Sequence, residues 1–182
     1  MSTKGKAIHI SKLDAAVRQL EVAIKMFFSY GDPVAIHTLA AAAHGVIADL
    51  GEKQNLKGIL RDMSIVRAER RDEVKVMLRK PQNFFKHSDR DGQEKEIIEF
   101  IPSLTEFFLY DTCMLYVQIA NENRTILQLY NVWFFLNHPG LLVDVQKEAK
   151  MIEIARSLQL NVQDRGAFLS ILPDMIKAQG GI

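Results

Sequence analysis

Apolar residues recur every three or four positions along most of this chain, the spacing that places them on one face of an α-helix. In the first segment, from Ser11 to Gly31, they are Leu13, Val17, Leu20, Ile24, Phe27 and Phe28. Ser11 and Asp14 have the spacing of a capping box, in which each side chain accepts a hydrogen bond from the other residue's backbone. The pattern predicts a helix that begins at Ser11 and ends near Gly31.

A second helix is predicted from Asp32 to Gly51. Asp32 suits the N-cap, and Pro33 suits the first helical position, where the missing N–H costs nothing. The run Ala40–Ala43 keeps one side of this helix thin, so that a neighbour can pack closely. Because the connection between the two helices is so short, they are expected to form an antiparallel hairpin.

Helical spacing continues from Lys53 to Lys80, although Gly58 weakens its beginning. The pattern is also compatible with a break near Ser64 to Ala68. Pro81 is expected to break this helix, because proline cannot donate the next helical hydrogen bond and clashes with the preceding turn. The residues that follow Pro81 are therefore predicted to lie on a bend or on the first turn of a new element.

Ser103 and Glu106 form a second capping box, which predicts a helix from Ser103 to about Asn121. Further helical patterns cover residues 126–136, 143–158 and 164–179. The last of them is expected to bend or to be interrupted at Pro173. No segment alternates in the manner of a β-strand, so the predicted fold class is all-α.

A chain of 182 residues fits one domain. We expect an antiparallel helical bundle over residues 11–121, with additional helices over 122–182. Two apolar stripes in the second part must be buried, either by closing the bundle or in a subunit contact. They consist of Val145, Ala149, Ile152 and Ala155, and of Phe168, Leu172, Met175 and Ile176.

Composition excludes only a few classes of function. A formal net charge of +1 gives no global attraction to nucleic acid or to an anionic membrane, so electrostatic binding would need a local patch. The single cysteine, Cys113, excludes an intrachain disulfide and a thiolate metal cluster. No secretory signal and no membrane-spanning segment is evident, which favours a cytoplasmic protein without membrane contact. The absence of a Gly-rich phosphate loop and of a GxSxG elbow disfavours an ATPase or a serine hydrolase.

The densest group of polar chemistry lies at residues 83–91, immediately after Pro81. His87 can act as acid and base in metal-independent RNA cleavage if a cation, Arg79, Arg90 or Lys86, stabilises the phosphate charge. Asn83, one helical turn before His87, can orient the ring. The competing interpretation is structural, with the polar residues capping helix ends and the neighbouring phenylalanines filling the core.

Four cations lead into this group at four-residue spacing: Arg67, Arg71, Lys75 and Arg79. Like charges at this spacing slightly destabilise a helix, so helix stability does not explain the stripe. Binding of an acidic partner, such as a phosphate backbone, would explain it. Interleaved carboxylates, Asp62, Glu69, Asp72 and Glu73, offer the alternative of an ordinary solvated face.

A metal site is the weaker alternative. His37 and His44 share a face of the second helix, and His87 or Asp89 is a conceivable third ligand. No HExxH or similar motif supports such a site, so neither a metal nor another cofactor is expected. The aromatic residues of the segments 107–116 and 130–135 are expected to pack in the core rather than to line a pocket.

The segment Pro81–Asp91, with Leu104–Phe107 and Trp133–Pro139 downstream, resembles a family of uncharacterised bacterial proteins that carry an NFFKHADRD-type motif. A helical hairpin followed by an Asn-x-x-x-His turn and another long helix is also distantly similar to HEPN domains, helical modules often found in RNA-cleaving toxins and defence systems. Asn83 and His87 match that family's asparagine and histidine, whereas Gln82 stands where its arginine would be. The resemblance implies a homodimer, and the missing arginine favours a member that binds without cleaving.

Two hypotheses follow from the sequence. The first is a protein that binds or cleaves RNA without a metal, centred on His87, with Asn83, Arg79 and Arg90 in supporting roles. Arg67, Arg71, Lys75 and Lys86 would then hold the nucleic acid. The second is a non-catalytic module that binds a protein partner through the same bend or through the C-terminal helices.

Overall fold

The computed structural model describes residues 7–63, 66–87, 97–141, 145–157 and 159–180. Among these residues the secondary structure is helical and no strand occurs, which confirms the predicted all-α class. The α-helices are α1 (Lys12–Phe28), α2 (Pro33–Glu52), α3 (Arg71–Lys86), α4 (Leu104–Ala120), α5 (Thr125–Asn137), α6 (Val145–Ser157) and α7 (Arg165–Gly180), and a short 3₁₀ helix, η2 (Ala68–Arg70), precedes α3.

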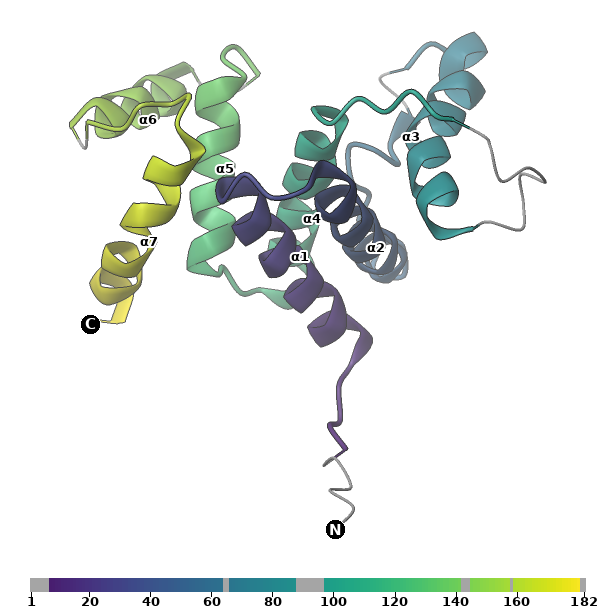
Figure 1. Cartoon of the computed structure of the whole chain (residues 1–182), viewed down its shortest axis with the longest axis horizontal. Helices are drawn as coiled ribbons and strands as arrows, with labels where there is room; N and C mark the ends of the chain where they lie inside the picture. Colours follow the sequence, from purple (N-terminus) through teal and green to yellow (C-terminus); the bar gives the residue numbers. More distant parts are fainter. Residues whose placement is uncertain (1–6, 64–65, 88–96, 142–144, 158, 181–182) are drawn as a thin grey trace.

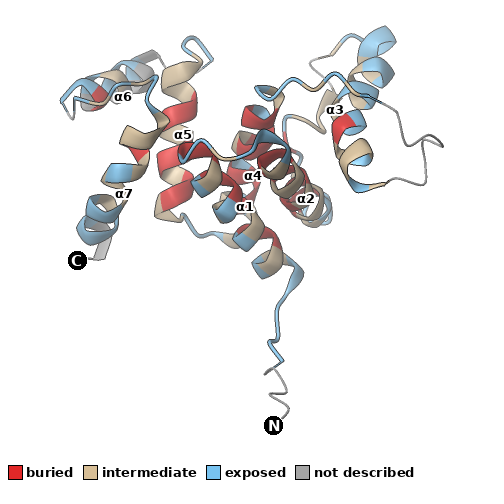
Figure 2. Ribbon diagram, in the orientation of Figure 1, coloured by how far each residue is buried: buried red, intermediate tan, exposed pale blue. Residues whose placement is uncertain are grey.

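Helices α1, α2 and α4 form the centre of the protein (Figure 1). Helix α2 packs against both α1 and α4, and α3 lies on the outer side of α2. Helices α5 and α7 pack on α1 at the opposite end of the molecule, and α6 contacts α5. This arrangement leaves α3 covered on one side only, and half of its residues are exposed (Figure 2).

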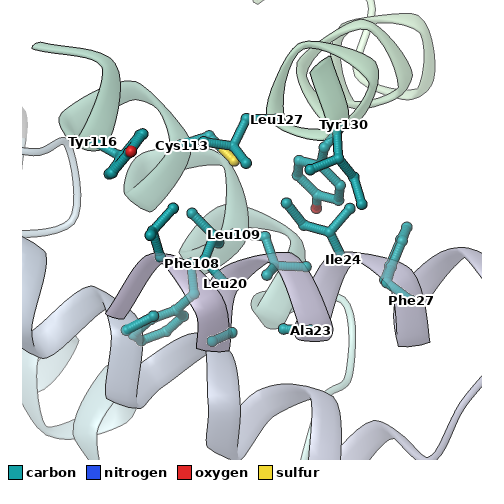
Figure 3. Packing of buried hydrophobic residues seen from close by; sticks show 14 of the residues in the cluster. Leu20, Ala23, Ile24, Phe27, Phe108, Leu109, Cys113, Tyr116, Leu127 and Tyr130 are labelled. Atoms are coloured by element: carbon teal, nitrogen blue, oxygen red, sulfur yellow. The ribbon is translucent and has the colours of Figure 1, made fainter. Parts of the chain in front are cut away.

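The hydrophobic core runs from α1 through α2 and α4 to α5 (Figure 3). Leu20, Ile24, Leu109 and Leu127 are fully buried in it. The ring of Phe168 on α7 stacks on that of Phe28, with ring centroids 6.0 Å apart. The apolar stripe of α7 thus closes the core at Phe168.

The predicted start signals of the first two helices are confirmed. Ser11 Oγ accepts a hydrogen bond from the backbone N–H of Asp14 at 3.0 Å, and the Asp14 carboxylate accepts one from the backbone of Ser11. Asp32 Oδ1 accepts from the N–H of Ala35 at 2.9 Å, directly before Pro33. These contacts satisfy donors that a helix N-terminus leaves unpaired.

Two predictions about helix boundaries were wrong. The helix expected from Lys53 to Lys80 begins only at Arg71, because residues 53–62 form turns that dock on α4. Pro81 does not end α3, which continues to Lys86. A proline inside a helix removes a single backbone hydrogen bond, and here its buried ring contributes apolar packing in return. Residues 83–86 therefore occupy the last turn of α3 rather than a bend.

The second capping box does not form. Ser103 precedes α4 but makes no side-chain capping bond. The carboxylate of Glu106 is engaged elsewhere, 3.0 Å from His138 Nε2 and 3.4 Å from Arg165 Nη2. Pro173, the other expected break, lies within α7, which continues past it to Gly180.

Among the described residues one helix, α2, is long and apolar enough, by length and composition alone, to cross a membrane. Its most apolar 18-residue window has a mean hydropathy of 1.4, and half of that window is buried inside the protein. The core helices of soluble proteins meet the same criterion, so the finding is weak evidence for a membrane span.

Candidate functional site

A cavity of about 460 Å³ lies between α2, the turns that follow it, and α3. Its polar lining includes His44 of α2, Arg61 of the turns, and Lys75 and Arg79 of α3. Phe108 of α4 contributes an aromatic wall. A cavity of this size suits a small ligand or one unit of a polymer.

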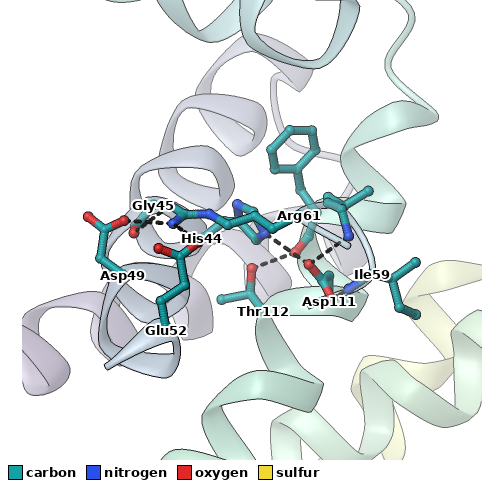
Figure 4. Close-up of polar contacts among 10 residues, drawn as sticks. His44, Gly45, Asp49, Glu52, Ile59, Arg61, Asp111 and Thr112 are labelled. Atoms are coloured by element: carbon teal, nitrogen blue, oxygen red, sulfur yellow. Dashed lines mark hydrogen bonds and ion pairs between the residues drawn. The ribbon is translucent and has the colours of Figure 1, made fainter. Parts of the chain in front are cut away.

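His44, which lines the cavity, is paired with a buried carboxylate that is not itself part of the lining. His44 Nε2 lies 2.9 Å from Asp111 Oδ2 on α4, and Asp111 is almost completely buried (Figure 4). The carboxylate also accepts hydrogen bonds from the backbone N–H groups of Ile59, at 2.7 Å, and Leu60, at 3.2 Å. Three donors thus hold the carboxylate in place, and the carboxylate fixes the orientation of the His44 ring.

Gly58 allows the turn that contains Ile59 and Leu60 to approach Asp111 on α4 closely. A Cβ atom at position 58 would lie 2.6 Å from Asp111 Oδ1 and 2.7 Å from Leu115 Cδ1. Both distances are below those found for real Cβ contacts, and the carboxylate cannot move without losing its three donors. The glycine that weakened the predicted helix is therefore required by the approach of the turn to α4.

We expect Gly58→Ala to destabilise the protein by about 2 kcal/mol, the range found for an overpacked core. Chemical unfolding monitored by circular dichroism measures this loss. Gly45→Ala is the matched control, since a Cβ there meets nothing within 4 Å and alanine favours the helix. Equal stability of the two variants would contradict the steric role of Gly58.

Arg61 also lines the cavity but is already paired. Its Nη1 lies 2.8 Å from Asp49 Oδ1 and 3.0 Å from Glu52 Oε1, and its Nη2 donates to the carbonyl of Gly45 at 3.3 Å (Figure 4). Burial alone would lower the pKa of Arg61, but the hydrogen bonds to Glu52 and Asp49 outweigh it and raise the pKa. One cation is thus shared by the two acidic groups of the cavity, and the group of three keeps one negative charge.

The cations predicted from the sequence have different surroundings. Lys75 and Arg79 line the cavity, and the ion pair of Lys75 with Asp72, at 3.2 Å, involves a carboxylate that is 96% exposed. Arg71 donates through Nε to the carbonyl of Val66 at 3.0 Å, which ties α3 to the preceding turn. Arg67 is exposed before η2. Only the second half of the stripe therefore faces the cavity.

The proposed catalytic group around His87 is not gathered at this cavity. His87 is the C-cap residue of α3 and is half-buried, while Asn83 and Lys86 are exposed on the last turn. None of these three lines the cavity, although Arg79 does. Arg90 and Asp89 lie outside the described residues.

His37 has a separate, structural environment. Its Nδ1 lies 2.9 Å from Thr105 Oγ1, and its fully buried ring is surrounded by Phe85, Phe100 and Phe108. Burial, with a smaller contribution from the charge of Lys86, lowers the pKa of His37 to about 4.

His37 and His44 share a face of α2 as expected, but each turns to its own partner. Within the described ranges no group of three or more potential ligands is placed to hold a metal ion.

Asp111 was missed by the sequence analysis. The only signal available was a carboxylate inside the apolar stretch Phe107–Leu115, where helical spacing places it among buried positions. A charge in such a position requires partners, and here they come from residues 51 to 67 positions away in the chain.

Comparison with known proteins does not identify a relative: no protein-family model, no curated protein and no solved structure matches this chain. The resemblances noted in the sequence therefore remain predictions. Any functional assignment depends on the geometry of the cavity.

Proposed function

We propose that the protein binds RNA, with the sugar–phosphate backbone lying along the cavity-facing side of α3. The observation that carries the proposal concerns two cations that line the same cavity as an oriented imidazole. They are Lys75, predicted to hold nucleic acid, and Arg79, predicted to stabilise phosphate charge. Lysine and arginine hold phosphates by charge-assisted hydrogen bonds.

Charge balance in the cavity supports an anionic ligand. Arg61 offsets one of the two carboxylate charges of Asp49 and Glu52. With Lys75 and Arg79 included, the charged residues that line the cavity sum to one positive charge. The exposed pair between Lys75 and Asp72 is weak enough for a phosphate to displace the carboxylate. No ion pair of Arg79 is found among the described residues. Two cations thus remain to bind phosphate.

Fluorescence anisotropy with a labelled single-stranded RNA of mixed sequence at low salt tests the proposal. The variant Lys75→Glu/Arg79→Glu should bind roughly ten-fold more weakly or worse. The slope of log K against log salt should also become shallower by about 1.4, since each lost phosphate contact to a single strand contributes about 0.7.

The control is Lys25→Glu/Lys150→Glu, which makes the same change in net charge at exposed positions of α1 and α6 away from the cavity. This variant should bind as the wild type does. If the wild type does not bind RNA at low salt, or if both double variants lose affinity equally, the proposal is wrong.

A second candidate function, binding of a protein partner or of a second copy of this chain, is favoured by one observation. Val76 and Met77 on α3 are 64% and 47% exposed, which is unusual for neighbouring apolar residues on a helix. If this surface forms a homodimer, Val76→Asp/Met77→Asp should give a monomer in light scattering. A wild type that is monomeric and captures no partner would exclude this candidate.

A further inference from the structure

We propose that His44 is a catalytic acid–base residue that cleaves the bound RNA without a metal ion, and that Asp111 positions it. This inference rests on the proposed binding of RNA at the cavity. It moves the chemistry from His87, the histidine singled out by the sequence, to a histidine that the fold places beside the phosphate-binding cations.

The tautomer of His44 is set by its surroundings. Asp111 accepts hydrogen bonds from the backbone N–H groups of Ile59 and Leu60, as an ionised carboxylate does. His44 Nε2 must therefore donate to Asp111 Oδ2 across the 2.9 Å contact. In a neutral ring the other nitrogen, Nδ1, then carries the lone pair that can take up a proton. A carboxylate that holds one ring nitrogen while the other acts as base is the general design of such pairs.

The cavity also supplies the electrostatic part of the reaction. Lys75 and Arg79 line the same space as the His44 ring, where they can stabilise the extra negative charge that develops on a phosphate during attack. Phe108 contacts the His44 ring edge-on, at a centroid distance of 5.2 Å, and limits its movement. Three separate helices thus supply the parts of the site: α2 the base, α4 the positioning carboxylate and α3 the cations.

The reaction can be written in full. His44 Nδ1 takes the proton of a ribose 2′-hydroxyl, and the resulting oxygen attacks the adjacent phosphorus. A bond forms between the 2′-oxygen and phosphorus, and the bond from phosphorus to the 5′-oxygen of the next nucleotide breaks. The departing 5′-oxygen takes a proton from water, and protonated His44 neutralises the hydroxide. The products are a 2′,3′-cyclic phosphate and a free 5′-hydroxyl, with no net uptake of protons.

The test must separate catalysis from the structural role of the pair. His44→Gln does so, because the glutamine Nε2 can still donate to Asp111 while no group remains to take up the proton. The substrate is a labelled RNA incubated with an excess of EDTA, and the products are resolved on a denaturing gel. A matched RNA whose nucleotides are all 2′-deoxy lacks the nucleophile and should remain intact.

We expect the wild type to cut the RNA in EDTA and to leave a 2′,3′-cyclic phosphate. His44→Gln should bind RNA within two-fold of the wild type but cut it about 100-fold more slowly, the usual contribution of a general base. Asp111→Asn should lower kcat while KM stays the same, because an amide in this position can hold the ring in the wrong tautomer. The variants, purified in parallel, also control for a contaminating nuclease, because a contaminant would cut the RNA equally in every preparation.

Other outcomes are equally informative. A wild type that binds RNA but leaves it intact overturns the catalytic inference and leaves the binding proposal standing. A wild type that does not bind RNA overturns the binding proposal itself. If His87→Gln abolishes cleavage and His44→Gln does not, the assignment to His44 is wrong and the histidine indicated by the sequence is the catalytic one.

Discussion

Replacement of Asp111 by alanine should lower the free energy of unfolding by about 3 to 5 kcal/mol. Two backbone N–H groups, of Ile59 and Leu60, and the ring nitrogen of His44 lose their acceptor at once. Each buried donor left unpaired costs about 1 to 3 kcal/mol, although water entering the vacated space recovers part of the loss. Urea unfolding followed by tryptophan fluorescence and circular dichroism measures the change.

Asp72→Ala is the control, because it removes a carboxylate that is 96% exposed and that pairs with Lys75. Exposed ion pairs contribute about 0 to 1 kcal/mol, so this variant should unfold almost as the wild type does. A double-mutant cycle adds a sharper test. Gly58→Ala should destabilise the Asp111→Ala protein less than the wild type, since the carboxylate that the new Cβ meets is absent. Strict additivity would show that residues 58 and 111 are not in contact.

The sequence predicted well those elements whose signals are local. Helix α1 begins at Ser11 because the capping box and the apolar stripe lie within one segment, and the same holds for Asp32 and Pro33 at α2. Helices α5, α6 and α7 also occur where the periodicity placed them. Local propensity and long-range packing agree at these positions, so the sequence pattern alone is sufficient to predict these helices.

The failures occur where a distant residue competes with a local signal. Residues 53–62 have helical spacing, but Asp111 binds two of their N–H groups and keeps them in turns. Glu106 has the spacing of a cap, but it pairs with His138 and Arg165 instead. Sequence spacing does not reveal such partners, which lie between 32 and 59 residues away.

The candidate site was anticipated in part. The regular cationic stripe identified Lys75 and Arg79, and both line the cavity. His44 was considered only as a metal ligand, because its partner Asp111 lies 67 residues further along the chain. His87 was singled out because of its neighbours in sequence, whereas the packing of α3 on α2 determines which histidine lines the same cavity as the cations.

His37 should make the protein less stable as the pH falls from about 6.5 to about 4. In the unfolded chain this histidine takes up a proton near its ordinary pKa of 6.5, whereas burial keeps the folded ring neutral down to about pH 4. Between these values the unfolded state binds more protons, so lowering the pH favours unfolding. The pKa difference corresponds to a loss of about 3 kcal/mol, almost complete near pH 4 and absent above pH 7.

The comparison of the wild type with His37→Phe isolates this contribution from that of other titrating groups. Phenylalanine fits among Phe85, Phe100 and Phe108, and the Thr105 hydroxyl, which loses its partner, can turn back to the main chain. Urea unfolding at several pH values gives the free energy of unfolding as a function of pH. For His37→Phe this free energy should fall less steeply with decreasing pH, by up to the slope that one bound proton contributes. His9→Gln, at an exposed position, should leave the curve unchanged. Parallel curves for the wild type and His37→Phe would mean that the folded protein protonates His37 as readily as the unfolded chain does, and that the ring is not sealed among these aromatic side chains.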